Sequence, residues 1–370
     1  MQPCHRLPHP PQSPHARTLP HLRTPLPSPR RAHPPERRLH RPLPLRRRRQ
    51  HRPQNLPHPP PQPTSTTPAF VLKQPLPRFK TAAEWLVDID RVKVERDCAQ
   101  LLHTLLPHAS VPDVLWFDEA NYILALSAAP ETARLWKSEL LSNLTSETAA
   151  LNAGTLLAIM HGSTHNDPAV RTRYGEPAFF LQQRIDPYLR TIAATHPDLA
   201  APINAVADNL LRDDQRTCLI HGDFSPKNIF LLEDDRLLLL DFEVAFFGNP
   251  AFDVATLLNH LLLKAFLHRH LSHAPTDPWK SMLDTFWETY RHTAPPDLVR
   301  QSSAAGGHLL AALLLARLDG KSPVEYLLPH PDLQSTIRTI ARDVLSQPPR
   351  DLPRTLATLM RTLDALPPQS

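Results

Sequence analysis

A short polar segment at residues 221–228, here called the catalytic loop, holds the side chains best suited to chemistry. Its sequence is His-Gly-Asp-Phe-Ser-Pro-Lys-Asn, which places Asp223 five residues before Asn228. A second acidic pair, Asp241 and Glu243, follows a run of four leucines. An aspartate that orients a hydroxyl, together with amide and carboxylate oxygens that bind Mg²⁺, provides what phosphoryl transfer requires.

The position of each residue predicts its role. Asp223 follows an apolar strand predicted at 218–220 and would accept or orient the proton of an attacking hydroxyl. Asn228 and Asp241 offer oxygens to Mg²⁺, and Glu243 would share a second metal ion or its water shell. The interval from the aspartate to the asparagine equals that in the protein-kinase loop H-R-D-x-x-x-x-N. Four polar groups at strand ends are costly unless they bind something.

Other polar residues of this kind are interpreted as structural. His221 is expected to hydrogen-bond to the loop backbone, and Lys227 to face solvent rather than phosphate. Asp253, at the start of a predicted helix, is expected to cap that helix or to anchor the catalytic loop. Arg317, at the end of another predicted helix, is explained equally well by the helix dipole or by contact with a substrate.

The elements that must position these residues are few strands followed by many helices. Short apolar runs predict strands, and apolar residues spaced by three and four predict helices. Predicted strands are 69–73, 114–117, 122–126, 218–220, 229–232 and 236–240. Predicted helices are 91–105, 131–160, 176–211 apart from its prolines, 254–266, 279–290, 308–317 and 333–345. This order indicates an α+β fold with two unequal lobes.

Composition divides the chain into three parts. Residues 1–63 contain 19 of the 44 prolines, 13 arginines and a single acid. Such a stretch has too little apolar surface to fold, so we predict disorder over 1–65. It could bind acidic partners or nucleic acid through the arginines at 46–49, be a solvated extension, or result from a misplaced start or reading frame. A partial small lobe over 66–130 and a helical lobe over 131–370 are predicted to follow.

Composition also limits the class of protein. Three scattered cysteines have no metal-ligand spacing and give no disulfide framework. No run of 18 apolar residues is present, and no secretory signal is visible, so we expect a cytoplasmic protein without a membrane span. Basic residues are not interleaved with aromatic ones, which argues against nucleic acid as the main partner. Oligomeric state is not readable from the sequence.

The catalytic loop together with residues 241–253 resembles the aminoglycoside phosphotransferase and choline kinase superfamily. This resemblance implies a protein-kinase-like two-lobed fold, ATP and Mg²⁺ as cofactors, and a small hydroxylated molecule as the acceptor. A more specific likeness, to the 5-methylthioribose kinases, lies in segments 71–77, 243–253 and 259–266. Those kinases have a serine in place of Asn228 and a proline in place of Phe242.

Two further site residues come from this resemblance. By it, Lys73 would hold the α- and β-phosphates of ATP at the end of a strand. Glu95, on the helix that follows 22 residues later, would be its ion-pair partner, as in the lysine–glutamate pair of kinases. Trp85 lies between them in the segment that carries the likeness.

The sequence has no glycine before Gly154. Kinases of this fold cover the triphosphate with a glycine-rich hairpin, because only glycine lets backbone N–H groups approach phosphate closely. We therefore predict an incomplete small lobe, with Lys73 on a sheet that lacks one edge, and weak ATP binding.

The function predicted is an ATP-dependent kinase acting on a hydroxyl of methylthioribose or a related sugar. The alternatives are a kinase for aminoglycosides or amino alcohols and a non-catalytic pseudokinase. The acceptor is expected to lie between the catalytic loop and the predicted helices 279–290 and 308–317.

Overall fold

The computed structural model describes residues 69–78, 85–272 and 275–366 of the 370-residue chain. The prediction of disorder for residues 1–65 therefore lies outside the described part. The division into lobes at residue 130 stays a prediction.

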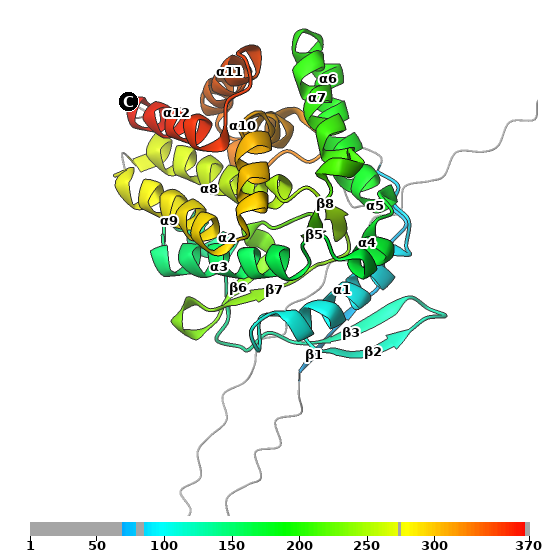
Figure 1. Cartoon of the computed structure of the whole chain (residues 1–370). Coiled ribbons are helices and arrows are strands. Elements are labelled where there is room, and N and C mark those ends of the chain that lie inside the picture. The colour runs from blue at the N-terminus through cyan, green and yellow to red at the C-terminus, as the bar shows by residue number, and fades with distance from the viewer. Residues whose placement is uncertain (1–68, 79–84, 273–274, 367–370) are drawn as a thin grey trace, which may run out of the picture. The chain divides into compact units, whose positions relative to one another are not determined.

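A three-stranded antiparallel sheet carries Lys73 at the end of one strand. The strands, in the order β1-β3-β2, are β1 (Phe70–Lys73), β3 (Ile123–Ser127) and β2 (Val114–Asp118) (Figure 1). Leu124 of the central strand pairs with Lys73 and is fully buried. The predicted hairpin of β2 and β3 is confirmed. In the described part of the chain β1 pairs only with β3, and its side chains Phe70 and Leu72 are more than half exposed.

Helix α1 (Arg91–Leu105) lies beside this sheet and has the bounds predicted from the sequence. Its apolar residues recur at intervals of three and four, so one face of the helix is buried. Cys98 and Leu102 join the main core, while Val92 packs with Leu124 under the sheet. The same buried face carries Glu95, which is 1% exposed.

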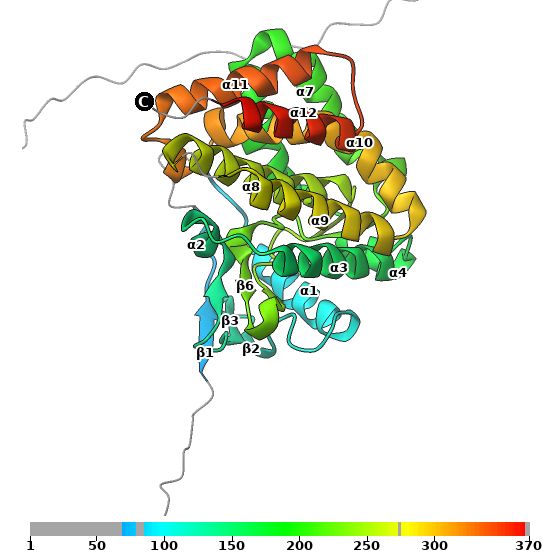
Figure 2. The same ribbon diagram turned by 90° about the vertical axis from the view of Figure 1, so that its left-hand side faces the viewer.

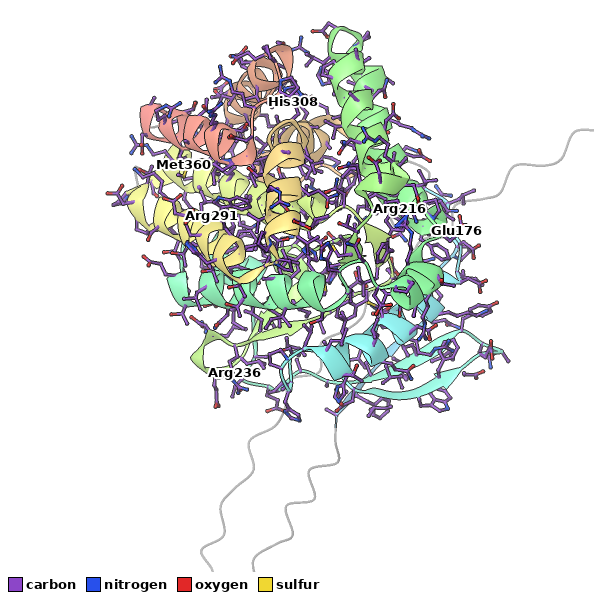
Figure 3. The ribbon with its side chains drawn as sticks, in the orientation of Figure 1. Glu176, Arg216, Arg236, Arg291, His308 and Met360 are labelled. Carbon is purple, nitrogen blue, oxygen red and sulfur yellow. The ribbon has the colours of Figure 1, made fainter. Side chains whose placement is uncertain are left out.

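Two small antiparallel sheets hold the catalytic loop. One pairs β5 (Cys218–Ile220) with β8 (Phe246–Gly248). The other has the order β4-β6-β7 and consists of β4 (Arg134–Leu135), β6 (Ile229–Leu231) and β7 (Leu237–Leu239). Arg216, labelled in Figure 3, precedes β5 and ties it to β8. Its Nε donates to the Phe247 carbonyl at 3.1 Å, and its guanidinium lies 4.7 Å above the Phe246 ring.

The rest of the described chain is helical. The α-helices are α2 (Trp136–Leu141), α3 (Glu147–Ser163), α4 (Pro168–Tyr174), α5 (Ala178–Phe180), α6 (Thr191–Thr195), α7 (Ala200–Leu211), α8 (Ala251–Ser272), α9 (Asp277–Thr293), α10 (Pro296–Asp319), α11 (Pro331–Ser346) and α12 (Leu352–Ala365). Single 3₁₀ turns occur at Pro197–Leu199, Asp213–Gln215, Pro226–Asn228, Glu233–Asp235 and Glu325–Leu327. Helix α10 contacts α7, α8, α11 and α12, while α9 packs on α3 below α8 (Figure 2).

Two predicted helices are corrected by the structure. The helix predicted over 131–160 is broken between α2 and α3, where Asn143 has φ +60° and Ser146 caps α3 by accepting from the Ala149 N–H. The helix predicted over 176–211 is interrupted by a π-helical stretch, Leu181–Arg190, that contains Pro187. Proline has no N–H for the regular α ladder, and the wider π turn accommodates that loss.

The predictions for the later helices are confirmed in type but are too short. Residues 254–266, 279–290, 308–317 and 333–345 all lie inside the longer helices α8 to α11, and α12 was not predicted. Few strands and many helices confirm the predicted α+β fold. Among the residues described, no helix is both long and apolar enough to cross a membrane.

Candidate active site

The catalytic loop connects β5 to β6 and turns sharply at Gly222. Gly222 has φ +74°, a conformation that side chains with a Cβ rarely adopt. A Cβ at this position would lie 2.5 Å from the carbonyl oxygen of Val244. The middle residue of the triplet must therefore be glycine if the loop is to lie this close to the segment after β7.

Asp253 anchors the loop from the first turn of α8. Its Oδ2 accepts from the His221 N–H at 2.6 Å, and its Oδ1 accepts from the Gly222 N–H at 3.0 Å. The imidazole Nε2 of His161 lies 3.3 Å from Oδ2. Asp253 is fully buried, so it acts as the anchor that the sequence predicted.

His221 is structural, as predicted from the sequence. Its Nδ1 accepts from the Asp223 N–H at 3.2 Å, so the proton of a neutral ring belongs on Nε2, which lies 3.0 Å from the Leu240 carbonyl oxygen. Burial lowers the pKa of His221 and keeps the ring neutral, against the opposing charge of Asp253. This ring thus links the catalytic loop to the end of β7.

Asp223 is buried between two cations. Its Oδ2 lies 3.0 Å from Nη2 of Arg184 and 2.8 Å from Nζ of Lys227. Burial alone would raise the pKa of Asp223, but Lys227 and then Arg184 outweigh it and hold the pKa well below its usual range. Arg184 also donates from Nε to the Gly222 carbonyl at 2.5 Å. The carboxylate is therefore ionised and fixed in direction.

Asn228 closes the loop through its side-chain amide. Its Nδ2 donates to the backbone carbonyl of Asp223 at 3.0 Å, and the residue is 6% exposed. This hydrogen bond fixes the orientation of the side-chain amide, because its nitrogen donates within the catalytic loop. In the described part of the chain the Asn228 Oδ1 makes no hydrogen bond, which leaves this oxygen for a cation.

Lys73 joins the sheet, α1 and the end of β7. Its Nζ lies 2.5 Å from Oε1 of Glu95 and 2.6 Å from Oδ1 of Asp241. Burial opposes the charge of Lys73, but Asp241 and Glu95 raise its pKa above the ordinary value. Burial raises the pKa of Glu95, although Lys73 opposes that change. The structure thus brings together the lysine and glutamate that the resemblance had paired.

Asp241 stands in a strained backbone position. Its φ is +72°, in the left-handed region where a residue other than glycine is uncommon. Burial would raise the pKa of Asp241, but Lys73 more than offsets this and lowers it, so the carboxylate is ionised. Strain of this kind persists where the surrounding structure holds a functional side chain in place.

Glu243 lies beside Asp241 but has a cationic partner of its own. Its Oε2 accepts from Nε of Arg91 at 2.9 Å. Burial and then Asp241 raise the pKa of Glu243, against the opposing effect of Arg91.

One oxygen each of Glu95, Asp241 and Glu243 lie within 4.8 Å of one another, close enough to share a cation. These hard oxygen donors fit Mg²⁺. The sequence also predicted Asn228 as a ligand, and that role stays a prediction.

A cavity lies beside Lys73. It has a volume of about 300 Å³ and is bounded by residues 73–76 and 78 and by the buried face of α1. Lys73, Glu95 and Glu243 line it. The lysine expected to meet phosphate and one of the acids expected to meet metal, Glu243, therefore face a common space.

Several residues of the site were not predicted from the sequence. Arg184 lies in a segment with no motif, and only its burial beside Asp223 reveals it. Lys227 was expected to face solvent; its side chain is half exposed, yet it forms an ion pair with Asp223. The i, i+4 spacing of Asp223 and Lys227 was the one available signal for that pair.

The position predicted for the acceptor, between the catalytic loop and residues 279–290 and 308–317, stays a prediction. Helix α9, which contains residues 279–290, packs on α3, and its large side chains Trp279 and Tyr290 are buried in the core. In the described residues no hydrogen bond or ion pair joins α9 directly to the catalytic loop. The end of α10 does reach this region, since Arg317 bonds to Tyr188, which lies beside Arg184.

In kinases a strand lysine pairs with a helix glutamate, opposite a metal-binding aspartate. This chain has that arrangement, which defines its class as kinase-like. The particular family follows from the sequence comparison: the chain belongs to the phosphotransferase enzyme family, whose model matches residues 62–299.

Curated relatives include methylthioribose kinases. The protein from Pectobacterium carotovorum subsp. carotovorum (strain PC1) is 28% identical over 240 residues, which cover 52% of this chain and 54% of that protein. The protein from Klebsiella pneumoniae (strain 342) is 26% identical over 221 residues, with coverage of 52% and 54%. The chain thus spans about half the length of the curated relatives it matches.

Similar solved structures include a choline/ethanolamine kinase family protein from Mesorhizobium loti. It has a TM-score of 0.44 and 15% identity, and the match covers 79% of this chain and 87% of that one. An aminoglycoside phosphotransferase from Alicyclobacillus acidocaldarius subsp. acidocaldarius has a TM-score of 0.43 and 11% identity, with coverage of 82% and 89%. These likenesses are too weak to carry a conclusion about function.

Proposed function

We propose that this chain is an ATP-dependent kinase that transfers a phosphoryl group to a hydroxyl of a small molecule. The observation that carries the proposal is the position of Lys73, whose Nζ contacts both Glu95 and Asp241. A cation held between a helix glutamate and a strained aspartate is the arrangement that kinases use at the nucleotide phosphates. Family membership supports the same reaction class.

Each site residue has a role in this proposal. Lys73, oriented by Glu95, holds the α- and β-phosphates of ATP. Asp241, Glu243 and Asn228 hold Mg²⁺, which when bound neutralises charge on the phosphate oxygens. A cytoplasmic location, where ATP is available, belongs to the same proposal.

Asp223 orients the attacking hydroxyl. Its carboxylate is paired with Arg184 and Lys227, so it is a weak base. In the loose transition state of phosphoryl transfer the proton leaves late, and a positioned carboxylate that accepts it late is sufficient. Lys227, half exposed beside Asp223, is also placed to contact the transferred group.

The acceptor proposed first is methylthioribose or a related sugar, because the curated relatives are methylthioribose kinases. An aminoglycoside or an amino alcohol is the second candidate. A non-catalytic pseudokinase is the alternative from a different class. Its support is the lack of glycine before Gly154 and the single partner strand of β1 in the described part of the chain.

The test is ADP formation by the purified full-length chain with ATP, Mg²⁺ and a panel of sugars, aminoglycosides and amino alcohols. Asp223→Asn keeps the shape of the side chain and should reduce kcat by about 10²–10⁴-fold. Asp297→Asn, an exposed acid on α10, is the matched control and should leave kcat unchanged.

Turnover that survives in Asp223→Asn would exclude this aspartate as the catalytic residue. ATP binding without turnover of any acceptor would favour the pseudokinase.

A further inference from the structure

A second group of polar side chains lies next to Asp223 on the helical side. Its members come from the π-helical stretch, from α8, from the end of α10 and from the turn that follows α10. They are Arg184, Tyr188, His260, Lys264, Arg317 and Tyr326. Of these residues, only Arg184 has a role in the site described above, where it pairs with Asp223.

Arg317 is a cation without an acidic partner. Its Nη1 donates to the Tyr188 hydroxyl at 2.9 Å, and its guanidinium lies 5.5 Å from the centre of that ring. Among the described residues it forms no ion pair, and its buried Nε has no hydrogen-bond partner. A buried donor left unpaired costs free energy, which a ligand acceptor would recover. The dipole of α10 explains a cation at this helix end, but it does not satisfy Nε.

The pKa of Tyr188 reflects the positive electrostatic potential of this region. Arg184 and Arg317 lie 5.7 Å and 5.5 Å from the same ring. Burial would raise the pKa of Tyr188, but Arg317 and then Arg184 outweigh it and lower the pKa. Two guanidinium groups therefore stabilise negative charge here, and only one of them, Arg184, is paired with a carboxylate.

Lys264 is the second cation without an acidic partner. It is 1% exposed, and among the described residues its Nζ contacts the His260 carbonyl oxygen at 3.2 Å and the face of the Tyr326 ring at 5.0 Å but forms no ion pair. Burial, and then the charges of Lys137 and Arg317, lower its pKa to about 7. The buried Oη of Tyr326 also lacks a hydrogen-bond partner in the described chain.

Helix geometry connects these groups to the catalytic loop. His260 and Lys264 follow Asp253 by seven and eleven residues, about two and three turns, so all three lie on one face of α8. The Asp253 carboxylate accepts a hydrogen bond from the backbone of the catalytic loop. The negative charge of Asp223 acts on the pKa of His260. Lys264 therefore lies on the same face of α8 as the residue that anchors the catalytic loop.

The local charge balance is positive. Arg184 and Lys227 share the single carboxylate of Asp223. Among the described residues Arg317 and Lys264 have none, and Glu325, the acid whose charge acts on Lys264, forms an ion pair with Lys137. A cationic ligand would be repelled by these groups, whereas an anion would be bound by them.

We propose that the acceptor is an anionic hydroxyl compound, a sugar acid or sugar phosphate, whose acid group binds Arg317 and Lys264 while its hydroxyl faces Asp223. This inference rests on the proposed kinase function and narrows its acceptor class. Arg317 offers Nε and a second nitrogen to two oxygens of the acid, and Tyr326 offers its hydroxyl. Among sugars related to methylthioribose, this anion site favours those that carry an acid group. It disfavours aminoglycosides and amino alcohols, which are cationic.

The test uses pairs of acceptors in which one member carries an acid group that the other lacks. D-gluconate is compared with D-glucitol, and D-ribose 5-phosphate with D-ribose, with choline and kanamycin as cationic probes. Binding to the full-length chain is measured by isothermal titration, and ADP formation is measured in parallel. We expect at least one acid to bind ten-fold or more tightly than its neutral partner; the preferred pair distinguishes carboxylate from phosphate.

Variants connect that preference to the residues. Arg317→Gln should reduce the affinity for the preferred acid by ten-fold or more and leave the affinity for its neutral partner unchanged. Arg317→Lys keeps the charge but loses the planar fork, so it should give an intermediate loss and serves as well if Arg317→Gln fails to fold. Arg300→Gln removes an exposed arginine from the same helix and should change neither affinity.

The outcomes separate this inference from the proposed function. Acid binding that requires Arg317, without ADP formation, supports the anion site and contradicts the kinase. ADP formation with neutral or cationic acceptors, unaffected by Arg317→Gln, supports the kinase and overturns the anion site. Absence of binding by every acid in the panel also overturns it.

Discussion

Replacing the buried Lys264 by methionine should stabilise the folded protein. A lysine whose pKa falls from 10.5 to about 7 on folding costs roughly 5 kcal/mol of stability below pH 7, because one pKa unit corresponds to about 1.4 kcal/mol. Methionine has a similar length and no charge, so that cost disappears. The lost hydrogen bond to His260 and the contact with the Tyr326 ring offset about 1–2 kcal/mol of the gain.

The gain should depend on pH with a defined sign. Between pH 7 and 10.5 the unfolded chain binds the proton of this lysine and the folded chain does not, so the cost of Lys264 decreases as pH rises. It is roughly 5 kcal/mol at pH 6 and roughly 2 kcal/mol at pH 9. Lys264→Met should therefore be more stable than wild type by about 3 kcal/mol at pH 6 and by less than about 1 kcal/mol at pH 9.

The charges of the groups that face Lys264 explain why its pKa is lowered and why the gain in stability is larger at low pH. They are Lys137, His260, Arg317, Glu325 and Tyr326. Lys137 and Arg317 repel the ammonium, and only the acid Glu325 favours it. Burial, and then Lys264 itself, keep the pKa of His260 well below its usual value, so this imidazole does not titrate between pH 6 and 9.

Urea unfolding at pH 6, 7.5 and 9 measures the effect. Groups that the charge of Lys264 does not influence titrate alike in both proteins and cancel in the difference between variant and wild type. Lys280→Met, which removes an exposed lysine from α9, is the control and should change stability by less than about 1 kcal/mol at every pH. A gain that is equal at pH 6 and 9, or larger at pH 9, would refute the assignment of Lys264 as an uncompensated buried cation.

Three other substitutions test the site. Gly222→Ala should destabilise the chain by about 1–3 kcal/mol in urea unfolding, since the added Cβ meets the Val244 carbonyl at positive φ. Asp253→Asn should cost about 1–3 kcal/mol in the same assay, because one of the two backbone donors loses its acceptor; an unchanged midpoint would contradict the anchoring role. Lys73→Met should weaken ATP binding by ten-fold or more in isothermal titration, whereas Lys93→Met, on the exposed side of α1, should not.

Local signals predicted the centre of the site well. The catalytic loop lies between two short apolar strands, and its histidine and its anchor Asp253 behave as their positions indicated. The resemblance implied the pairing of Lys73 with Glu95, and in the structure the Lys73 Nζ contacts the Glu95 Oε1. The break before α3 had a local signal that was not used, the capping side chain of Ser146.

Long-range partners could not be predicted in this way. Arg184 precedes Asp223 by 39 residues in a segment without a motif, and its π-helical setting around Pro187 departs from the regular period. Lys264 lies in an apolar helix where a lysine suggests an exposed edge. Its burial results from packing against α10 and Tyr326, which no local pattern encodes.

The face of α8 that carries Asp253 and Lys264 fixes the separation between the anchor of the catalytic loop and the unpaired lysine. Eleven residues of α-helix separate the two positions by about 16 Å along the helix axis, and a helix buried on nearly all sides neither stretches nor bends easily. The catalytic loop is attached at one end of this span and the unpaired lysine stands near the other. Their relative position is therefore set when the chain folds and does not adjust to a ligand.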